Sequence, residues 1–183
     1  SIMLYFGMLF FGLYIMEESV LPLRDSQEFV DWIARIENNH VEGAISGGII
    51  TLLVQSSSAT VGMAIVLGKQ NLINLSGGIA VMLGAELGTC SDTLLATINS
   101  TRQALKAGLF HLLFNFITIC IGLLIFNPFV SLVQNISGQL SIDQQIANAH
   151  MLFNTLGVIF FVPFVGLAVR FFEWLVPEKN VTR

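Results

Sequence analysis

The chain has 183 residues, of which 54% are hydrophobic and only 11% charged, and its formal net charge at pH 7 is -4. Soluble domains usually carry about 25% charged residues, so this composition, with a mean hydropathy of +0.77, excludes an ordinary soluble domain and indicates a membrane protein. A net charge this small gives no sign of nucleic-acid binding, and the length fits one domain or one repeat of a larger transmembrane body.

The first apolar run, Ile2 to Met16, is slightly shorter than the ~20 residues that a spanning helix needs. It lacks the basic region and the small-residue cleavage site of a signal peptide. Because the chain begins inside this apolar segment, we expect a processed product or a piece of a longer polypeptide.

The segment 17–42 is polar and holds seven acidic residues against Arg24 and Arg35. Its apolar side chains recur at helical spacing, namely Phe29, Trp32, Ile33 and Ile36. This pattern predicts a short amphipathic helix, which either lies at the membrane surface or forms an ordinary soluble cap.

The segment 43–68 has no charged residue, yet it contains the run Gln55-Ser56-Ser57-Ser58. The placement of Lys and Arg predicts a cytoplasmic 99–106 loop, a cytoplasmic C-terminus and an external 128–145 loop. If the acidic segment 17–42 is also external and 72–99 crosses inward, then 43–68 enters and leaves on the same side. The arms flanking the polar run would be about 18 Å and about 15 Å long as helices, too short for a hydrocarbon core of ~30 Å. The sequence therefore predicts a re-entrant hairpin with the polar run at its tip.

The tip of such a hairpin is a favourable place for ions. Hydroxyls, an amide and the free N–H groups at the start of the second arm suit an anion. Hydroxyl and carbonyl oxygens also suit a hard cation. The alternative is that the serines hydrogen-bond to their own helix and pack as small residues against a neighbour.

Within the segment 72–99, the motif 84–92 carries two glycines, Gly84 and Gly88, and two acidic residues, Glu86 and Asp92. Gly-interrupted apolar segments are typical of the discontinuous helices of transporters, so we expect a broken helix here. A carboxylate at membrane depth usually faces a cavity or a partner, and a cation or a proton could neutralise Glu86. Alternatively, both acidic side chains reach water at the end of a short helix.

Two further transmembrane helices are predicted at 107–127 and 146–169. They share a short repeat, H-L-L-F-N ending at Asn115 and H-M-L-F-N ending at Asn154, which puts a His and an Asn on one face of each helix. We expect these pairs to hydrogen-bond between helices rather than to contact a ligand.

Neither catalysis nor a cofactor is predicted. Ser57, His111 and Asp92 could in principle form a triad, but no G-x-S-x-G nucleophile elbow surrounds the serines, and spacing alone does not make a triad. Cys90 and Cys120 match no metal or disulfide pattern, so we expect them to be free.

Three stretches, V-Q-S-S-S-A-T, G-A-E-L-G-T-C-S-D-T and I-A-N-A-H-M-L-F-N-T-L-G-V-I-F-F-V-P-F, together resemble the sodium-dependent phosphate cotransporter family, the type II Na/Pi family and its bacterial relatives. The resemblance covers nearly the whole chain. It implies a multi-pass protein of the plasma membrane or the bacterial inner membrane that couples phosphate transport to sodium by alternating access.

The resemblance also implies a fold and a site. Members of the family carry two inverted repeats, each with one Q-S-S-S hairpin, and the two hairpins form the site together. Residues 1–183 would be one all-α half, the second repeat, and the other half would come from the same polypeptide or from a homodimer mate in the lipid bilayer. The implied phosphate contacts are Gln55, Ser56, Ser57 and Ser58; the implied sodium ligands are Gln55, Ser58, Glu86, Thr89 and Ser91; and the supporting residues are Thr60, Asp92, Asn115 and Asn154.

The chain departs from the family pattern at two positions. The family often has G-A-N-I-G-T-T where this chain has Glu86 and Cys90. A carboxylate near a divalent anion is repulsive unless a cation intervenes, so the coupling ion and the anion stay open. The alternatives are a transporter of another tetrahedral oxyanion and a non-transporting half-protein that regulates or scaffolds a partner.

Overall fold

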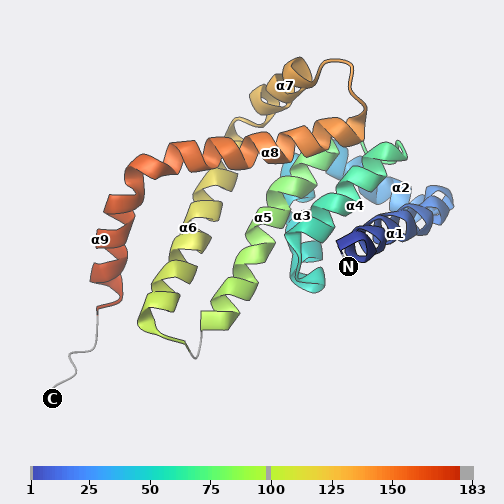
Figure 1. Cartoon of the computed structure of the whole chain (residues 1–183). Coiled ribbons are helices and arrows are strands. Elements are labelled where there is room, and N and C mark those ends of the chain that lie inside the picture. The colour runs from blue at the N-terminus through green and yellow to red at the C-terminus, as the bar shows by residue number, and fades with distance from the viewer. Residues whose placement is uncertain (1, 98–99, 178–183) are drawn as a thin grey trace.

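The computed structural model describes residues 2–97 and 100–177, except for the side chains of Asp92 and Leu94, and it is helical throughout, with no strand in these residues (Figure 1). This confirms the all-α prediction. Four helical stretches of the described chain are long and apolar enough to cross a membrane: Ile2–Asp25, Leu75–Thr97, Arg102–Leu124 and Ile142–Leu175.

The N-terminal part consists of helix α1 (Ile2–Val20), the 3-10 turn η1 (Leu21–Asp25) and helix α2 (Gln27–Asn38). The Ser26 hydroxyl caps α2 by accepting a hydrogen bond from the Phe29 N–H. Ile33 and Ile36 of α2 are buried while its other face is exposed, so α2 is amphipathic, and its place at the membrane surface stays a prediction.

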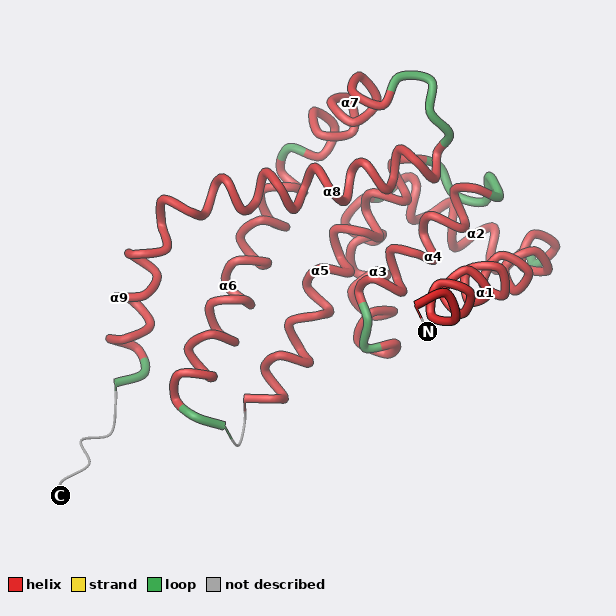
Figure 2. The backbone as a smooth tube through the Cα atoms, in the orientation of Figure 1, coloured by secondary structure: helices red, strands yellow, loops and turns green. Residues whose placement is uncertain are grey.

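Helices α3 (His40–Val54) and α4 (Ser57–Lys69) form a hairpin joined by a turn of two residues (Figure 2). They have 15 and 13 residues, so their lengths are about 22 Å and about 20 Å, both less than a bilayer core of ~30 Å. The predicted pair of short helical arms is present, and the turn lies at the start of the polar run. Its re-entrant position in a membrane stays a prediction.

Helix α5 (Leu75–Thr97) runs without a break through the G-A-E-L-G-T motif, so the prediction of a discontinuous helix is wrong. The two glycines serve close packing instead. A Cβ on Gly84 would lie 1.7 Å from the Ala44 carbonyl oxygen, and one on Gly88 would lie 2.5 Å from Cβ of Thr51. Helix α3 therefore packs against the backbone of α5, which only glycine permits at these positions.

The C-terminal half comprises α6 (Arg102–Leu124), α7 (Phe126–Ser137), α8 (Ile142–Phe161), η2 (Val162–Phe164) and α9 (Val165–Leu175). Figure 1 shows α8 crossing one end of the molecule and α9 turning sharply to run back along α6. Pro163 lies in the intervening 3-10 turn, and a proline removes a backbone donor and disfavours continuation of a straight helix. The predicted helix 146–169 is thus two helices, α8 and α9.

Helix α5 occupies the centre of the fold and packs against α2, α3, α4, α6 and α8. Its side chains Ile79, Met82 and Leu83 are completely buried. The two polar motifs of the sequence are the run 55–58 and the segment 84–92. The first follows α3, which packs along α5, and the second is part of α5 itself.

Candidate functional site

The first candidate site is the turn between α3 and α4. Gln55 adopts the left-handed conformation (φ 58°, ψ 33°), and its N–H donates to the Thr51 carbonyl at 2.7 Å, which closes the end of α3. Left-handed backbone costs a non-glycine residue roughly 1–3 kcal/mol and is often found at binding sites. The turn thus brings an exposed amide side chain to the hairpin tip.

The serines occupy the first positions of α4. Ser56 is the N-cap: its hydroxyl accepts from the Ala59 N–H at 3.2 Å and lies 3.1 Å from the Ser58 hydroxyl. The first N–H groups of a helix have no partner within it, and they carry the positive end of the helix dipole. Ser58 is exposed, and Ser56 and Ser57 are half-buried, so the tip presents hydroxyls and N–H groups together.

Thr60 lies one turn deeper in the hairpin and connects the two arms. Its hydroxyl accepts from the Thr51 hydroxyl at 2.8 Å and donates to the Ser56 carbonyl at 3.2 Å. Both threonines are buried. Thr60 therefore links the two arms below the tip, and its supporting role at a binding site stays a prediction.

The second motif lies on α5, and its hydroxyls bond to the helix itself. Thr89 donates to the Ala85 carbonyl at 3.2 Å, and Ser91 donates to the Gly88 carbonyl at 2.7 Å. Each hydroxyl oxygen keeps lone pairs that can accept a proton donor or coordinate a cation. The side chain of Asp92, another predicted supporting residue, lies outside the described residues.

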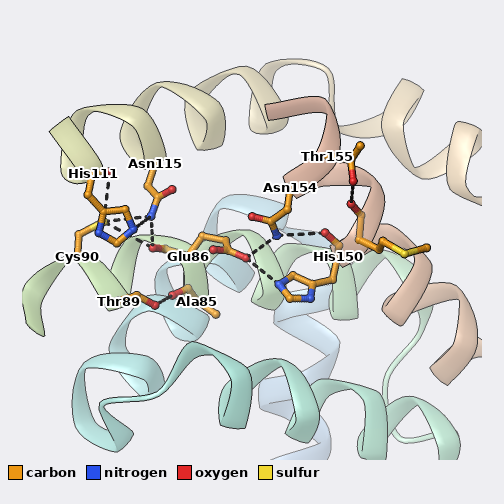
Figure 3. Close-up of polar contacts among 10 residues, drawn as sticks. Ala85, Glu86, Thr89, Cys90, His111, Asn115, His150, Asn154 and Thr155 are labelled. Carbon is orange, nitrogen blue, oxygen red and sulfur yellow. Dashed lines mark hydrogen bonds and ion pairs between the residues drawn. The ribbon is translucent and has the colours of Figure 1, made fainter. Parts of the chain in front are cut away.

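Glu86 is held by two side chains of α8 (Figure 3). Its Oε1 accepts from His150 Nε2 at 2.9 Å and from Asn154 Nδ2 at 3.0 Å. Only 13% of the Glu86 side chain is exposed, so a partner is required to offset the loss of water. The carboxylate thus joins α5 to α8 and does not reach solvent at a helix end.

The other His-Asn pair lies on α6 and also contacts α5 (Figure 3). Asn115 on α6 donates to the Glu86 backbone carbonyl at 3.0 Å, and its Nδ2 lies 3.2 Å from both Cys90 Sγ and His111 Nε2. Thr93 on α5 contacts the other ring nitrogen of His111 at 3.2 Å. Both pairs therefore join neighbouring helices, as predicted.

A model of the Na+/Pi-cotransporter family matches residues 8–172. The chain belongs to the Na+/Pi-cotransporter family. This confirms the resemblance drawn from the three sequence motifs and identifies the four apolar helical stretches as those of a membrane transport family.

Three curated relatives show what this chain is similar to. The chain is 26% identical over 94% of its length to YqeW of Bacillus subtilis (strain 168), named as an uncharacterised protein, and covers 56% of it. It is 23% identical over 94% of its length to YjbB of Escherichia coli (strain K12), named for inorganic phosphate export, and covers 32% of it. A shorter match, at 27% identity over 47% of the chain and 14% of the relative, is to the sodium-dependent phosphate transport protein 2A of Ovis aries. The chain thus spans about half of YqeW and a third of YjbB, and no solved structure matches it.

In this member of the Na+/Pi-cotransporter family, the two motifs are adjacent but not joined. The contact of Thr51 with Gly88 brings the end of α3 against the second motif. Among the described residues, however, no hydrogen bond links the side chains of 55–58 to those of 84–91.

His150 and His111 are the members of the polar cluster that the sequence did not assign to a site. The repeated H-x-L-F-N pattern singled them out, but it gave no partner for Glu86. That partner lies 64 residues away in the chain, and only the packing of α5 against α8 brings the two together.

Proposed function

We propose that this chain supplies one half of a transporter that couples the movement of inorganic phosphate to sodium. Membership of the Na+/Pi-cotransporter family and the match to a sodium-dependent phosphate transport protein support the substrate and the coupling ion. The observation that carries the proposal is the position of the Q-S-S-S run at the start of α4, at the tip of a hairpin of two short helices.

The phosphate group is bound at this tip by the N–H groups of the first turn of α4 and by the hydroxyls of Ser56, Ser57 and Ser58. Helix N-termini bind phosphate through such N–H groups and through the helix dipole. Neither 55–60 nor 84–92 contains a Lys or Arg. The remaining positive charge must therefore come from sodium, whose ionic charge would be the largest in the site.

Sodium is coordinated by oxygens of Gln55, Ser58, Thr89 and Ser91, whose carbonyl and hydroxyl groups suit a hard cation. Glu86 remains a predicted ligand, with one condition that the structure adds. Its Oε1 already accepts from His150 and Asn154, so a cation there must share the carboxylate with α8 or displace α8 from it.

The site is completed by a second Q-S-S-S hairpin, from the same polypeptide or from a second copy of the chain. Gln55 and Ser58 are exposed, and a fully hydrated tip would give phosphate little advantage over water. A second hairpin facing the first would exclude water and double the number of donors.

The test is uptake of labelled phosphate by the full-length protein in proteoliposomes, with an inward gradient of sodium or of choline. The proposal expects uptake that requires the sodium gradient and that unlabelled phosphate suppresses. Stronger suppression by arsenate than by unlabelled phosphate would indicate another oxyanion as the preferred substrate. Equal uptake in choline would contradict sodium coupling, and the absence of any anion flux would favour the non-transporting half-protein.

The direction of net transport is a second question, because YjbB is named for phosphate export. Efflux is tested with the same liposomes loaded with labelled phosphate and placed in sodium or choline. If sodium entry drives export, phosphate efflux should require sodium outside the liposomes. If sodium and phosphate move together, efflux should require sodium inside the liposomes and choline outside.

A further inference from the structure

The groove between α6 and α9 lies outside both motifs. Helices α6 and α9 run side by side in opposite directions (Figure 1), so the start of α6 and the end of α9 lie at the same end of the molecule. There they enclose a cavity of ≈ 260 Å³, lined by Gln103, Lys106, Ala107, Phe110, Val169, Phe172 and Glu173. Ligand cavities are usually about 300 Å³ or larger, so this volume suits a small polar headgroup.

Two opposite charges face this groove without pairing. Lys106 of α6 and Glu173 of α9 both line the cavity, and in the described part of the chain neither forms an ion pair. Between them the floor is aromatic, with the rings of Phe110 and Phe172 in edge contact at 6.4 Å. A ligand that matches the groove therefore carries an anionic group and a cationic group close together.

Two apolar cavities also lie along α6 and α9. An adjoining cavity of ≈ 310 Å³ shares Phe172 and is otherwise lined by side chains such as Leu109, Leu112 and Phe116. A further cavity of ≈ 480 Å³ has an entirely apolar lining that includes Leu113 and Phe171. A hydrocarbon chain fits beside the charged end, so the ligand is an amphiphile.

The charged end of the groove lies at one end of two candidate membrane spans. One candidate span begins at Arg102 and another ends at Leu175, so Lys106 and Glu173 lie within one or two turns of these span ends, at the depth expected for phospholipid headgroups. Arg102 donates a hydrogen bond to the Pro177 carbonyl and thereby links the two helix ends beside the groove. Basic pockets between transmembrane helices bind anionic lipid headgroups, and in this pocket Glu173 adds a negative charge to the lining that holds Lys106.

We propose that this groove binds a phospholipid with a primary ammonium group, of the phosphatidylethanolamine class. The phosphate lies against Lys106, the ammonium donates to the Glu173 carboxylate, and an acyl chain follows the apolar cavities between α6 and α9. Glu173 selects against phosphatidylglycerol, whose headgroup has no cation to offer it. A choline headgroup keeps its charge but has no N–H to donate.

The experiment uses the full-length protein, extracted in mild detergent and equilibrated with equal amounts of phosphatidylethanolamine, phosphatidylglycerol and phosphatidylcholine of the same chain length. Native mass spectrometry counts each retained lipid. The unmodified protein is expected to retain phosphatidylethanolamine preferentially, and an excess of inorganic phosphate should leave that preference unchanged. Loss of the lipid to inorganic phosphate would overturn the proposal.

Two substitutions separate the charges. Glu173→Gln should lower the ratio of phosphatidylethanolamine to phosphatidylglycerol by about fivefold, the effect of one hydrogen bond. Lys106→Gln should lower retention of all three lipids, because each has a phosphate. Since the ratio is measured on the molecules that remain folded, a loss of yield does not affect it.

The control is Arg170→Gln, which removes an exposed cation of α9 that does not line the cavity. It should change neither the ratio nor the total. An unchanged ratio in Glu173→Gln, or an equal loss of lipid in Arg170→Gln and Lys106→Gln, would overturn the proposal in favour of a general basic surface. Retention of no lipid, with the groove covered by a second copy, would also overturn it.

Discussion

At the residue scale, the Glu86 carboxylate joins two helices through a single oxygen that accepts from both His150 and Asn154. Glu86→Ala should leave both donors without their acceptor and lower the free energy of unfolding by roughly 1–3 kcal/mol. Glu86→Gln keeps an acceptor oxygen there and should cost less. Thermal unfolding in detergent measures both, with Glu18→Ala on the exposed face of α1 as the control.

The same pair of variants tests the predicted cation role of Glu86. If the carboxylate coordinates sodium, Glu86→Gln should weaken the dependence of phosphate uptake on sodium concentration, because an amide lacks the charge. A sodium dependence with unchanged slope and midpoint would show that Glu86 serves only to join α5 and α8.

Ser57 is the first residue of α4, and in the described residues its hydroxyl forms no hydrogen bond that holds the fold. Ser57→Ala should therefore alter stability by less than about 0.5 kcal/mol. If its hydroxyl donates to bound phosphate, the lost charge-assisted hydrogen bond should reduce phosphate affinity by about 10-fold or more. Uptake at low phosphate concentration measures this.

The matched control is Ser141→Ala, which removes an exposed serine hydroxyl just before α8, outside both motifs. It should leave uptake unchanged. Full transport activity by an assembled Ser57→Ala protein would contradict the placement of phosphate at the hairpin tip.

At the scale of elements, the hairpin arm α3 and the central helix α5 approach at backbone distance. Gly47 and Gly84 lie at this contact, where a Cβ would meet the Val81 carbonyl oxygen at 2.1 Å and the Ala44 carbonyl oxygen at 1.7 Å. Side chains can rotate away from a collision, but a helix backbone cannot. The position of the hairpin on α5 therefore depends on the absence of two side chains.

Gly84→Ala should separate α3 from α5 and strongly lower the yield of folded protein. Overpacking of a core typically costs about 1–3 kcal/mol, and here the added methyl group would collide with backbone, which cannot rotate away. The matched control is Gly166→Ala in α9, where a Cβ meets nothing within 4 Å. That change should be neutral or slightly stabilising, because alanine favours a helix more than glycine does. Size-exclusion profiles of the two variants measure the difference, and a normal profile for Gly84→Ala would contradict the packing.

The same glycines show how far the sequence predicts this fold. The apolar runs mark real helices, and the polar run marks a real turn. Glycines within an apolar run, however, indicate either a break or a close contact, and the local sequence does not separate these cases. The contact depends on α3, some forty residues away, so the break predicted in α5 is wrong.

The candidate site was predictable to a similar degree. The Q-S-S-S run, Thr60 and the His-Asn pairs stand out because polar residues are rare in apolar segments. The partners of Glu86 were not predictable, because they depend on the way α8 crosses α5. The interruption at Pro163 and the sharp return of α9 along α6 were not predicted, since the sequence indicated one helix over 146–169.

At the scale of the whole molecule, the chain presents broad apolar surfaces on α1, α8 and α9, and it spans about half of YqeW. A membrane protein covers such surfaces with lipid or with further helices. The proposed half-site requires further helices on the side of the hairpin tip. The transport experiments therefore need the full-length protein.

The proposed site has no Lys or Arg in either motif, so sodium should control phosphate binding. Removing sodium should weaken phosphate binding by a factor of about 5 to 150, the usual range of coupling between two ligands. Because coupling is reciprocal, saturating phosphate should tighten sodium binding by the same factor. Calorimetric titration of full-length protein with phosphate, in sodium and in choline, gives the first factor. Titration with sodium, with and without phosphate, gives the second. Equal phosphate affinity in sodium and choline would contradict a site in which sodium supplies the positive charge, whatever the transport assay shows.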